Sequence, residues 1–424
     1  MTSAVRRALV GAGALATAAG VLAGCTSAGQ PMVVTTAART TIDGPLHVRV
    51  TGAPAGEDVV VSVESTDATG TAWRSSATYE ANTSGVVDVD TTASVKGTYT
   101  GVSGTGLVWS MRPVGTADAA YIWRRTGPSS FRVTVRAGDA TASARFERGL
   151  TATTLEHREA SLESDGFVGE LWSLPAGTQK HPAVLVIGGS EGGMNSFLAA
   201  SFAAHGYPSL AVAYFKAPGL PQTLSAIPLE YFEHALDWLA AQPGVDPSRI
   251  VVAGGSRGSE AAELLAVHDR ERVHGLIGAS PSDVVGCSIP DCDGPAWTLG
   301  GKAVPYTRTW NDPRATDNPR AVIPLAKAGG PVLLVCGEAD TLWDSCAYSR
   351  AAMAALDADP QAPPHELAAE PGAGHFVDQL VPGEPEVSPT EYTAAQHAME
   401  QAVMPDVWRR VLAFLAALGG SAPG

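Results

Sequence analysis

The residue pattern with the clearest chemical content is a serine between glycines at residues 254–258, which read Gly-Gly-Ser-Arg-Gly. This G-x-S-x-G pattern directly follows the apolar run 250–253 and precedes residues 259–268, where apolar side chains recur at helical spacing. A strand, a tight turn and a helix in this order are the context in which such a serine becomes an exposed nucleophile. The sequence therefore predicts that Ser256 attacks an electrophilic carbon such as an acyl carbonyl.

A serine hydroxyl is a weak nucleophile, so this chemistry requires a base and an acid that orients the base. In folds that carry the motif, the acid and then a histidine follow the serine along the chain. Asp340 comes just after an apolar run, and His375 lies in a glycine-rich turn after another extended run. We therefore expect Ser256, Asp340 and His375 to form a catalytic triad. Glu338 and Asp344 remain alternatives for the acid.

Backbone N–H groups close to the serine are the expected stabilisers of negative charge on the reacting oxygen. One belongs to Arg257, at the start of the predicted helix. The second is expected from the segment 188–193, Gly-Gly-Ser-Glu-Gly-Gly, which follows a predicted strand. Either Ser190 or Glu191 would provide it. A phosphate-binding loop is the other interpretation of this segment, but the Gly-Lys-Ser/Thr ending of such loops is missing.

Two hydrophobic patterns divide the remainder of the chain. Residues 39–150 alternate apolar and polar side chains between turn residues, which predicts an all-β sandwich. Residues 151–424 alternate short apolar runs with helical patterns, which predicts a mostly parallel sheet covered on both faces. An insert at about 281–330, rich in Gly, Pro and Trp, is expected to form an ordered lid over the site. The predicted strands are 183–187, 210–213, 250–253, 275–279 and 332–336, and the predicted helices are 196–205, 229–241, 259–268 and 406–418.

The N-terminus has the features of an export signal. Two arginines precede a short apolar run that ends in Leu-Ala-Gly-Cys at Cys25, which resembles the lipobox of bacterial lipoproteins. We expect residues 1–24 to be cleaved, Cys25 to be lipidated, and residues 25–38 to tether the chain to the outer face of the membrane. A plain secretory signal with an incidental cysteine is the alternative, and twin-arginine export remains open.

Charge and cysteine content exclude some functions. The formal net charge is −15 at pH 7 and the sequence contains no basic stripe, so we expect no nucleic-acid partner.

Four cysteines follow Cys25, an even number that suggests two disulfides in an exported chain. Pairing of nearest neighbours is the simplest of the three possible connectivities. No histidine stands at metal-ligand spacing from these cysteines, so we expect no metal and no cofactor. The four candidates are Cys287, Cys292, Cys336 and Cys346.

Motifs along nearly all of the mature chain together resemble the acyl-CoA thioester hydrolase and bile acid-CoA:amino acid N-acyltransferase family. In the first domain the resemblance rests on Trp-Arg-Ser-Ser-Ala at 73–77, Gly-Thr-Tyr at 97–99 and Gly-Leu-Val-Trp-Ser-Met at 106–111. In the second domain it rests on segments 187–193, 203–207, 229–232, 255–260 and 337–340, on Trp343, Ser345, Gly374 and His375, and on Ala395, Gln396 and Trp408.

The resemblance implies an immunoglobulin-like domain followed by an α/β-hydrolase, with the triad on Ser256, Asp340 and His375. In this family a cysteine nucleophile is associated with the amino-acid conjugating branch and a serine with the thioesterase branch, so Ser256 implies hydrolysis. Cytosolic members act on CoA thioesters, but CoA is scarce outside a cell. The expected substrate is therefore a small acyl ester or thioester. An acyltransferase and a non-catalytic binding lipoprotein are the alternatives.

Overall fold

The computed structural model describes residues 31–115, 121–124, 127–151, 154–175, 177, 179–383 and 394–419. The expected signal peptide, Cys25 and the first part of the expected tether lie outside these residues. The rest of the tether segment differs from the expectation, because β1 (Val33–Thr35) pairs antiparallel with β3 (Arg49–Thr51) and buries Val34. Two consecutive β-branched valines favour pairing with a sheet over an extended linker.

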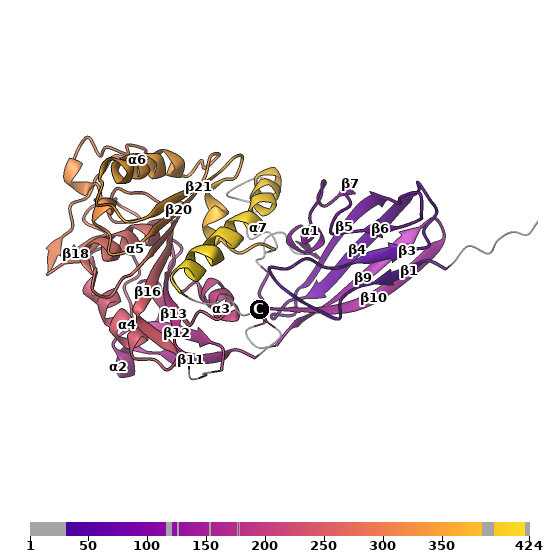
Figure 1. Ribbon diagram of the computed structural model, residues 1–424, viewed down its shortest axis with the longest axis horizontal. Helices are drawn as coiled ribbons and strands as arrows, with labels where there is room; N and C mark the ends of the chain where they lie inside the picture. The colour runs from indigo at the N-terminus through magenta and orange to yellow at the C-terminus, as the bar shows by residue number, and fades with distance from the viewer. Residues whose placement is uncertain are drawn as a thin grey trace, which may run out of the picture. The chain divides into compact units, whose positions relative to one another are not determined.

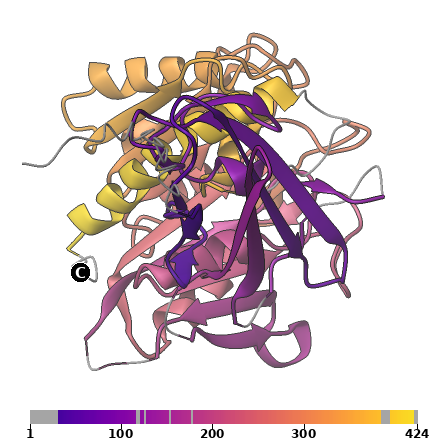
Figure 2. The same cartoon turned by 90° about the vertical axis from the view of Figure 1, so that its right-hand side faces the viewer.

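The first domain is a sandwich of two β-sheets (Figures 1 and 2). The smaller sheet has the order β1-β3-β6, and the larger has the order β2-β10-β9-β4-β5-β7 with β8 beside β5. Alternate side chains of the long strands are buried between the sheets, as the period of two predicts. The other elements are β2 (Arg39–Thr41), β4 (Asp58–Thr66), β5 (Ala72–Glu80), β6 (Val87–Asp88), β7 (Ser94–Gly97), α1 (Gly106–Trp109), β8 (Arg112–Pro113), β9 (Ser129–Ala137) and β10 (Ala140–Gly149).

The second domain is built on an eight-stranded sheet of order β11-β12-β14-β13-β16-β17-β20-β21. The pairs β11/β12 and β12/β14 are antiparallel and all other pairs are parallel. This topology confirms the predicted α/β-hydrolase fold. The strands are β11 (Glu156–Ala160), β12 (Val168–Ser173), β13 (His181–Ile187), β14 (Ser209–Ala213), β16 (Val245–Gly255), β17 (Leu276–Ala279), β20 (Val332–Gly337) and β21 (His365–Glu370).

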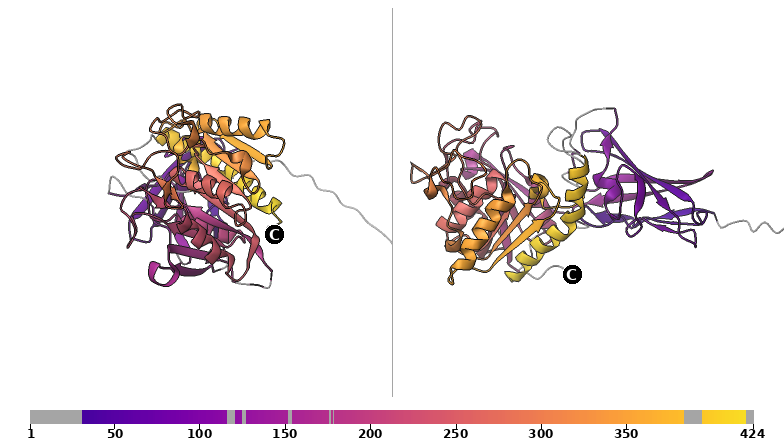
Figure 3. Two further views of the ribbon diagram at one scale, coloured as in Figure 1. Left: turned by 90° about the vertical axis from the view of Figure 1, so that its left-hand side faces the viewer. Right: turned by 90° about the horizontal axis from the view of Figure 1, so that it is seen from above.

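Helices cover both faces of this sheet (Figure 3). In the central strand β13, Leu185 and Ile187 belong to the core cluster that contains the buried faces of α4, α5 and α6. Val184 and Val186 point to the other face, toward the cluster formed with α3 and α7. A strand buried on both faces explains the unbroken apolar run in its sequence. The helices are α2 (Leu162–Asp165), α3 (Ser196–Ala204), α4 (Glu230–Ala240), α5 (Arg257–His268), α6 (Ser345–Ala358) and α7 (Ala394–Ala417).

The C-terminal helix is longer than the sequence pattern predicts. We expected a helix at 406–418, after Pro405, because proline lacks the N–H that a helix interior needs. The helix α7 instead begins at Ala394 and continues through Pro405. Apolar side chains on both sides of the proline, Met404 and Val407, are fully buried. Their packing against the sheet offsets the missing backbone hydrogen bond. No helix in the described part of the chain is long and apolar enough to span a membrane.

The insert between β17 and β20 contains short strands and 3₁₀ turns. Its strand β18 (Trp297–Leu299) lies between β15 (Ile227–Pro228) and β19 (Lys302–Ala303) in a small three-stranded sheet. Trp297 is fully buried, and a disulfide joins Cys287 to Cys292. Two short 3₁₀ turns, η1 (Pro319–Ala321) and η2 (Leu325–Lys327), lead back to β20.

Candidate active site

Ser256 occupies the turn between the end of β16 and the start of α5. Its backbone has φ 51° and ψ −123°, a strained conformation for a residue with a side chain. Its N–H donates a hydrogen bond to the carbonyl of Ala279 at the end of the neighbouring strand β17. The turn thus presents the hydroxyl at the carboxyl edge of the sheet, which is the expected position of a nucleophile in this motif.

Two glycines of the motif are required by close approaches of the backbone. A methyl group added to Gly254 would lie 2.3 Å from the carbonyl oxygen of Gly258. A methyl group added to Gly258 would lie 2.3 Å from the carbonyl oxygen of Gly188. The turn around Ser256 therefore packs directly against the glycine-rich loop that follows β13, with no side chain between the two backbones.

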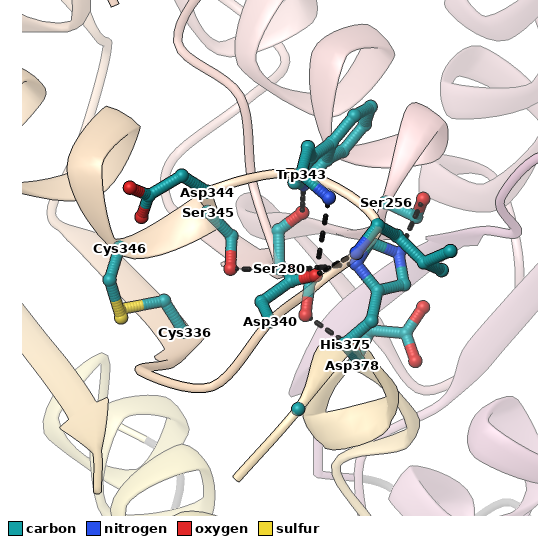
Figure 4. A network of polar contacts seen from close by, with 12 residues as sticks. Ser256, Ser280, Cys336, Asp340, Trp343, Asp344, Ser345, Cys346, His375 and Asp378 are labelled. Carbon is teal, nitrogen blue, oxygen red and sulfur yellow. Dashed lines mark hydrogen bonds and ion pairs between the residues drawn. A yellow bond between two sulfur atoms is a disulfide. The ribbon is translucent and has the colours of Figure 1, made fainter. Parts of the chain in front are cut away.

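His375 joins the serine to a carboxylate (Figure 4). Its Nε2 lies 2.9 Å from Ser256 Oγ, and its Nδ1 lies 2.8 Å from Asp340 Oδ2. The histidine begins the 3₁₀ turn η3 (His375–Gln379) just after β21, and Asp340 lies in the loop after β20. Three residues that are far apart in the sequence therefore meet at the carboxyl ends of the parallel strands β16, β20 and β21 of one sheet.

Asp340 is held by four hydrogen bonds. Besides the bond to His375, its Oδ2 accepts one from Ser345 Oγ at 2.6 Å, and its Oδ1 accepts bonds from the backbone N–H groups of Leu342 and Trp343. The Asp340 side chain is only 1% exposed. Such a network fixes the position of the carboxylate and thereby the orientation of the imidazole.

The two rival acids are engaged elsewhere. The Glu338 carboxylate forms an ion pair with Arg350. The Asp344 carboxylate accepts a hydrogen bond from the N–H of Ala347 and caps the N-terminus of α6. Neither contact leads to His375, so the geometry selects Asp340.

A disulfide closes the loop that carries the acid. Cys336 lies near the end of β20 and Cys346 in the first turn of α6, and the two sulfur atoms are bonded (Figure 4). Together with Cys287–Cys292, this gives pairing of nearest neighbours among the four cysteines. The cross-link brackets Asp340 and Ser345, so it limits the conformations open to that loop.

The side chain of Arg257 connects the nucleophile turn to the insert. The sequence predicted a role only for the backbone N–H of this residue. Its guanidinium is buried, forms an ion pair with Glu260 at 2.9 Å, and donates hydrogen bonds to the carbonyls of Gly286 and Cys287. Glu260 in turn accepts a bond from the indole N–H of Trp297. Both side chains are almost completely buried, so removal of either partner would leave the other charge buried and uncompensated.

The triad opens into a pocket of ≈ 880 Å³. Ser190 and Glu191, the two residues expected to offer the second oxyanion donor, are among its lining residues. The carboxylate of Glu191 accepts a hydrogen bond from the N–H of Gly189 at 2.9 Å. The lining also contains six apolar or aromatic side chains, which are Met194, Ile289, Trp310, Leu342, Trp343 and Phe376.

The sequence did not reveal a second carboxylate beside the imidazole, that of Asp378. It lines the same pocket and lies three residues after His375 in η3. Desolvation raises the pKa of Asp378 to about 7, against the opposing effect of His375. Burial alone would lower the pKa of His375, but the Asp340 hydrogen bond and the Asp378 charge outweigh it, so this pKa is above 6.5. The position of Asp378 three residues after His375 was the only feature of the sequence that could have indicated this contact.

A group of possible metal ligands lies on the antiparallel strands β11 and β12, away from the triad. His157, Glu159 and Glu170 bring one ligand atom each to within 4.8 Å of the others. Glu159 and Glu170 are directly opposed in the strand register. This grouping could not be predicted from the sequence, because the three residues have no motif spacing.

Comparisons with known proteins agree with this architecture. Residues 43–160 match the model of the acyl-CoA thioester hydrolase/BAAT N-terminal region. Residues 227–287 and 298–417 match the model of the BAAT/acyl-CoA thioester hydrolase C terminal. Together the matches cover more than half of the chain. The chain belongs to this family.

Relatives of this chain include both thioesterases and N-acyltransferases. Acyl-coenzyme A thioesterase 6 of Mus musculus is 29% identical over 81% of this chain and 84% of its own length. Acyl-coenzyme A amino acid N-acyltransferase 1 of Mus musculus is 27% identical over 82% of this chain and 86% of its own length. A hyperthermophilic esterase from Pyrobaculum calidifontis, 18% identical, matches 61% of this chain and 86% of its own with a TM-score of 0.40.

Proposed function

We propose that this member of the acyl-CoA thioester hydrolase/BAAT family is a serine hydrolase that cleaves an acyl thioester or carboxylic ester. The observation that carries the proposal is the continuous line of hydrogen bonds from Ser256 through His375 to Asp340, with distances of 2.9 and 2.8 Å. Activation of a hydroxyl by a base that is itself oriented is the requirement for acyl transfer through serine.

In the first half of the reaction Ser256 Oγ forms a bond to the acyl carbon while its proton passes to His375 Nε2. The tetrahedral intermediate collapses, the carbon–sulfur or carbon–oxygen bond breaks, and His375 gives the proton to the leaving thiol or alcohol. Water then attacks the acyl-enzyme with the same histidine as base, which releases the acid and restores Ser256. Asp340 holds the orientation of the imidazole and stabilises the imidazolium in both halves.

Backbone N–H groups are expected to stabilise the oxyanion of each intermediate. The N–H of Arg257 is at the first position of α5, where no carbonyl of its own helix is available to it. Ser190 or Glu191, in the loop packed against the turn, is proposed to provide the second donor.

An acyltransferase would use the same triad, and the N-acyltransferase relatives support this second candidate. Turnover of a butyryl thioester by the purified protein in the presence and absence of glycine separates the two. The hydrolase proposal predicts free butyrate in both cases, formed by wild type and lost in Ser256→Ala. Butyrylglycine as the main product would favour the transferase, and no turnover of any thioester or ester by the folded protein would favour a binding role.

We also propose that the chain is exported and anchored through a lipid on Cys25, with the sandwich as an immunoglobulin-like module next to the membrane. The Leu-Ala-Gly-Cys sequence and the two disulfides support an oxidising, extracytoplasmic location. In a bacterial host, the wild type is expected in the detergent phase after phase separation, with a mass that includes the lipid. Recovery of Cys25→Ala and wild type in the same aqueous fraction would contradict the anchor.

A further inference from the structure

The outer face of the larger sandwich sheet carries a row of charges across four strands. Glu64 on β4 is opposite Arg74 on β5 and also opposite Arg132 on β9. Arg132 is in turn opposite Arg145 on β10. The order across the sheet is therefore Arg74, Glu64, Arg132, Arg145. Figure 1 shows these four strands side by side in one sheet.

Only one end of this row is neutralised. Arg74 Nη2 and Glu64 Oε1 form an ion pair at 2.6 Å. Among the described residues, neither Arg132 nor Arg145 has an ion pair, although both are exposed. The next carboxylate along β10, that of Glu147, is paired with Arg39. Like charges directly opposite each other on neighbouring strands destabilise a sheet, so this pair works against the stability of the domain.

The row borders a shallow pocket of ≈ 650 Å³ on the sandwich. Arg124 contributes a fourth guanidinium to its lining, and the hydroxyl residues Thr66 and Ser130 contribute polar groups. This concentration of cations stands out because the whole chain carries a formal net charge of −15. A cluster of arginines that costs stability in an acidic protein indicates a bound anion, since planar guanidinium groups match phosphate oxygens in pairs.

We infer that this arginine pocket (Arg74, Arg124, Arg132 and Arg145 around Glu64) binds a phosphate-bearing anion. Phosphate chemistry is shared by a free phosphate compound and by the headgroup of an anionic lipid. The inference does not depend on the hydrolase activity, because the pocket contains none of the residues of the triad and lies entirely on the sandwich.

Calorimetric titration of the full-length protein in neutral detergent micelles tests the inference with three probes. They are inorganic pyrophosphate, dihexanoyl phosphatidylglycerol and, as an uncharged comparison, dihexanoyl phosphatidylcholine. Saturable binding of pyrophosphate identifies a free phosphate as the ligand, and binding of phosphatidylglycerol but not phosphatidylcholine identifies a lipid headgroup. Either result supports the inference if Arg132→Gln and Arg145→Gln each weaken binding about fivefold or more.

Arg136→Gln is the matched control, because Arg136 lies on the same strand and the same exposed face but outside the pocket lining. It changes the net charge equally and is expected to alter binding less than twofold at physiological salt. The melting temperature of Arg132→Gln is expected to equal or exceed that of wild type, which shows that the arginine is not structural. No saturable binding of either anion, or equal losses in Arg132→Gln and Arg136→Gln, would overturn the inference.

Discussion

The loop after β20 and the loop after β13 each bring a carboxylate to the candidate active site, but they hold it in different ways. Asp340, in the first loop, accepts four hydrogen bonds, and its side chain is almost fully buried. Glu191, in the second loop, accepts a hydrogen bond from Gly189 N–H, and the residue is exposed. The first arrangement suits a group that must keep one orientation through every proton transfer. The second suits a group that meets the substrate and solvent.

The largest effect is expected from the buried carboxylate. Asp340→Asn preserves the shape of the site but removes the charge that fixes the His375 tautomer, so kcat is expected to fall roughly 10³- to 10⁴-fold. Glu338→Gln is the control in the same loop, where loss of an exposed ion pair should change kcat less than about twofold. Steady-state hydrolysis of a butyryl thioester measures both. Equal rates for the two variants would contradict the assignment of the acid.

A smaller loss is expected when one of the supports of Asp340 is removed. Ser345→Ala deletes a hydrogen bond to the carboxylate while three others remain, so kcat is expected to fall by roughly tenfold, as for one bond to a charged group. Ser349→Ala is the matched control one turn along α6, since its hydroxyl bonds the carbonyl of Ser345 instead. A lower kcat in Ser345→Ala than in Ser349→Ala would show that the Ser345 hydroxyl acts on the carboxylate. Equal values would show that it acts only on the helix.

The third prediction concerns pH and Asp378, the second carboxylate near the imidazole. Because His375 acts as a base only when neutral, kcat/KM is expected to fall as the pH drops through its raised pKa, which lies above 6.5. Removing the nearby negative charge in Asp378→Asn lowers that pKa and moves the acid limb of the profile to lower pH. Asp139→Asn, in an exposed turn of the sandwich, should leave the limb in place. A shift to higher pH would contradict the account.

The smallest effect is expected from the exposed carboxylate. Glu191→Gln retains an acceptor for the N–H of Gly189 but removes a charge that shares the pocket with Ser256. Wild type should therefore prefer butyrylthiocholine over its uncharged 3,3-dimethylbutyl analogue by a few fold in kcat/KM at low salt, and the variant should prefer it less. High salt should reduce the preference of the wild type. A preference that is the same in both proteins would show that Glu191 does not sense the charge of the substrate.

The sequence predicted those parts of the molecule that depend on local pattern. The run 250–253, the glycines around Ser256 and the helical spacing that follows them specify a strand, a turn and a helix without reference to the rest of the chain. The family resemblance and the order Ser, acid, His then selected His375 and favoured Asp340. The structure gives their distances and shows why Glu338 cannot replace Asp340, since its carboxylate pairs with Arg350.

The features that the sequence did not predict depend on contacts between distant segments. The buried pair of Arg257 and Glu260 contacts the insert. The sequence identifies the insert only as a long irregular segment and does not predict its contacts. The arginine row is invisible in the sequence because its members are aligned by strand register. Helix α7 continues through Pro405 because the burial of side chains on either side offsets the missing backbone hydrogen bond. Local helix propensity does not include this burial.

The central claim, that Ser256 is a nucleophile activated by His375 and Asp340, is tested most directly by intact mass after treatment with a fluorophosphonate. The account predicts one adduct on the wild type, no adduct on Ser256→Ala, and strongly slowed labelling of Asp340→Asn. A wild-type protein that is folded and remains unlabelled, or a Ser256→Ala variant that is labelled as fast as wild type, would contradict it.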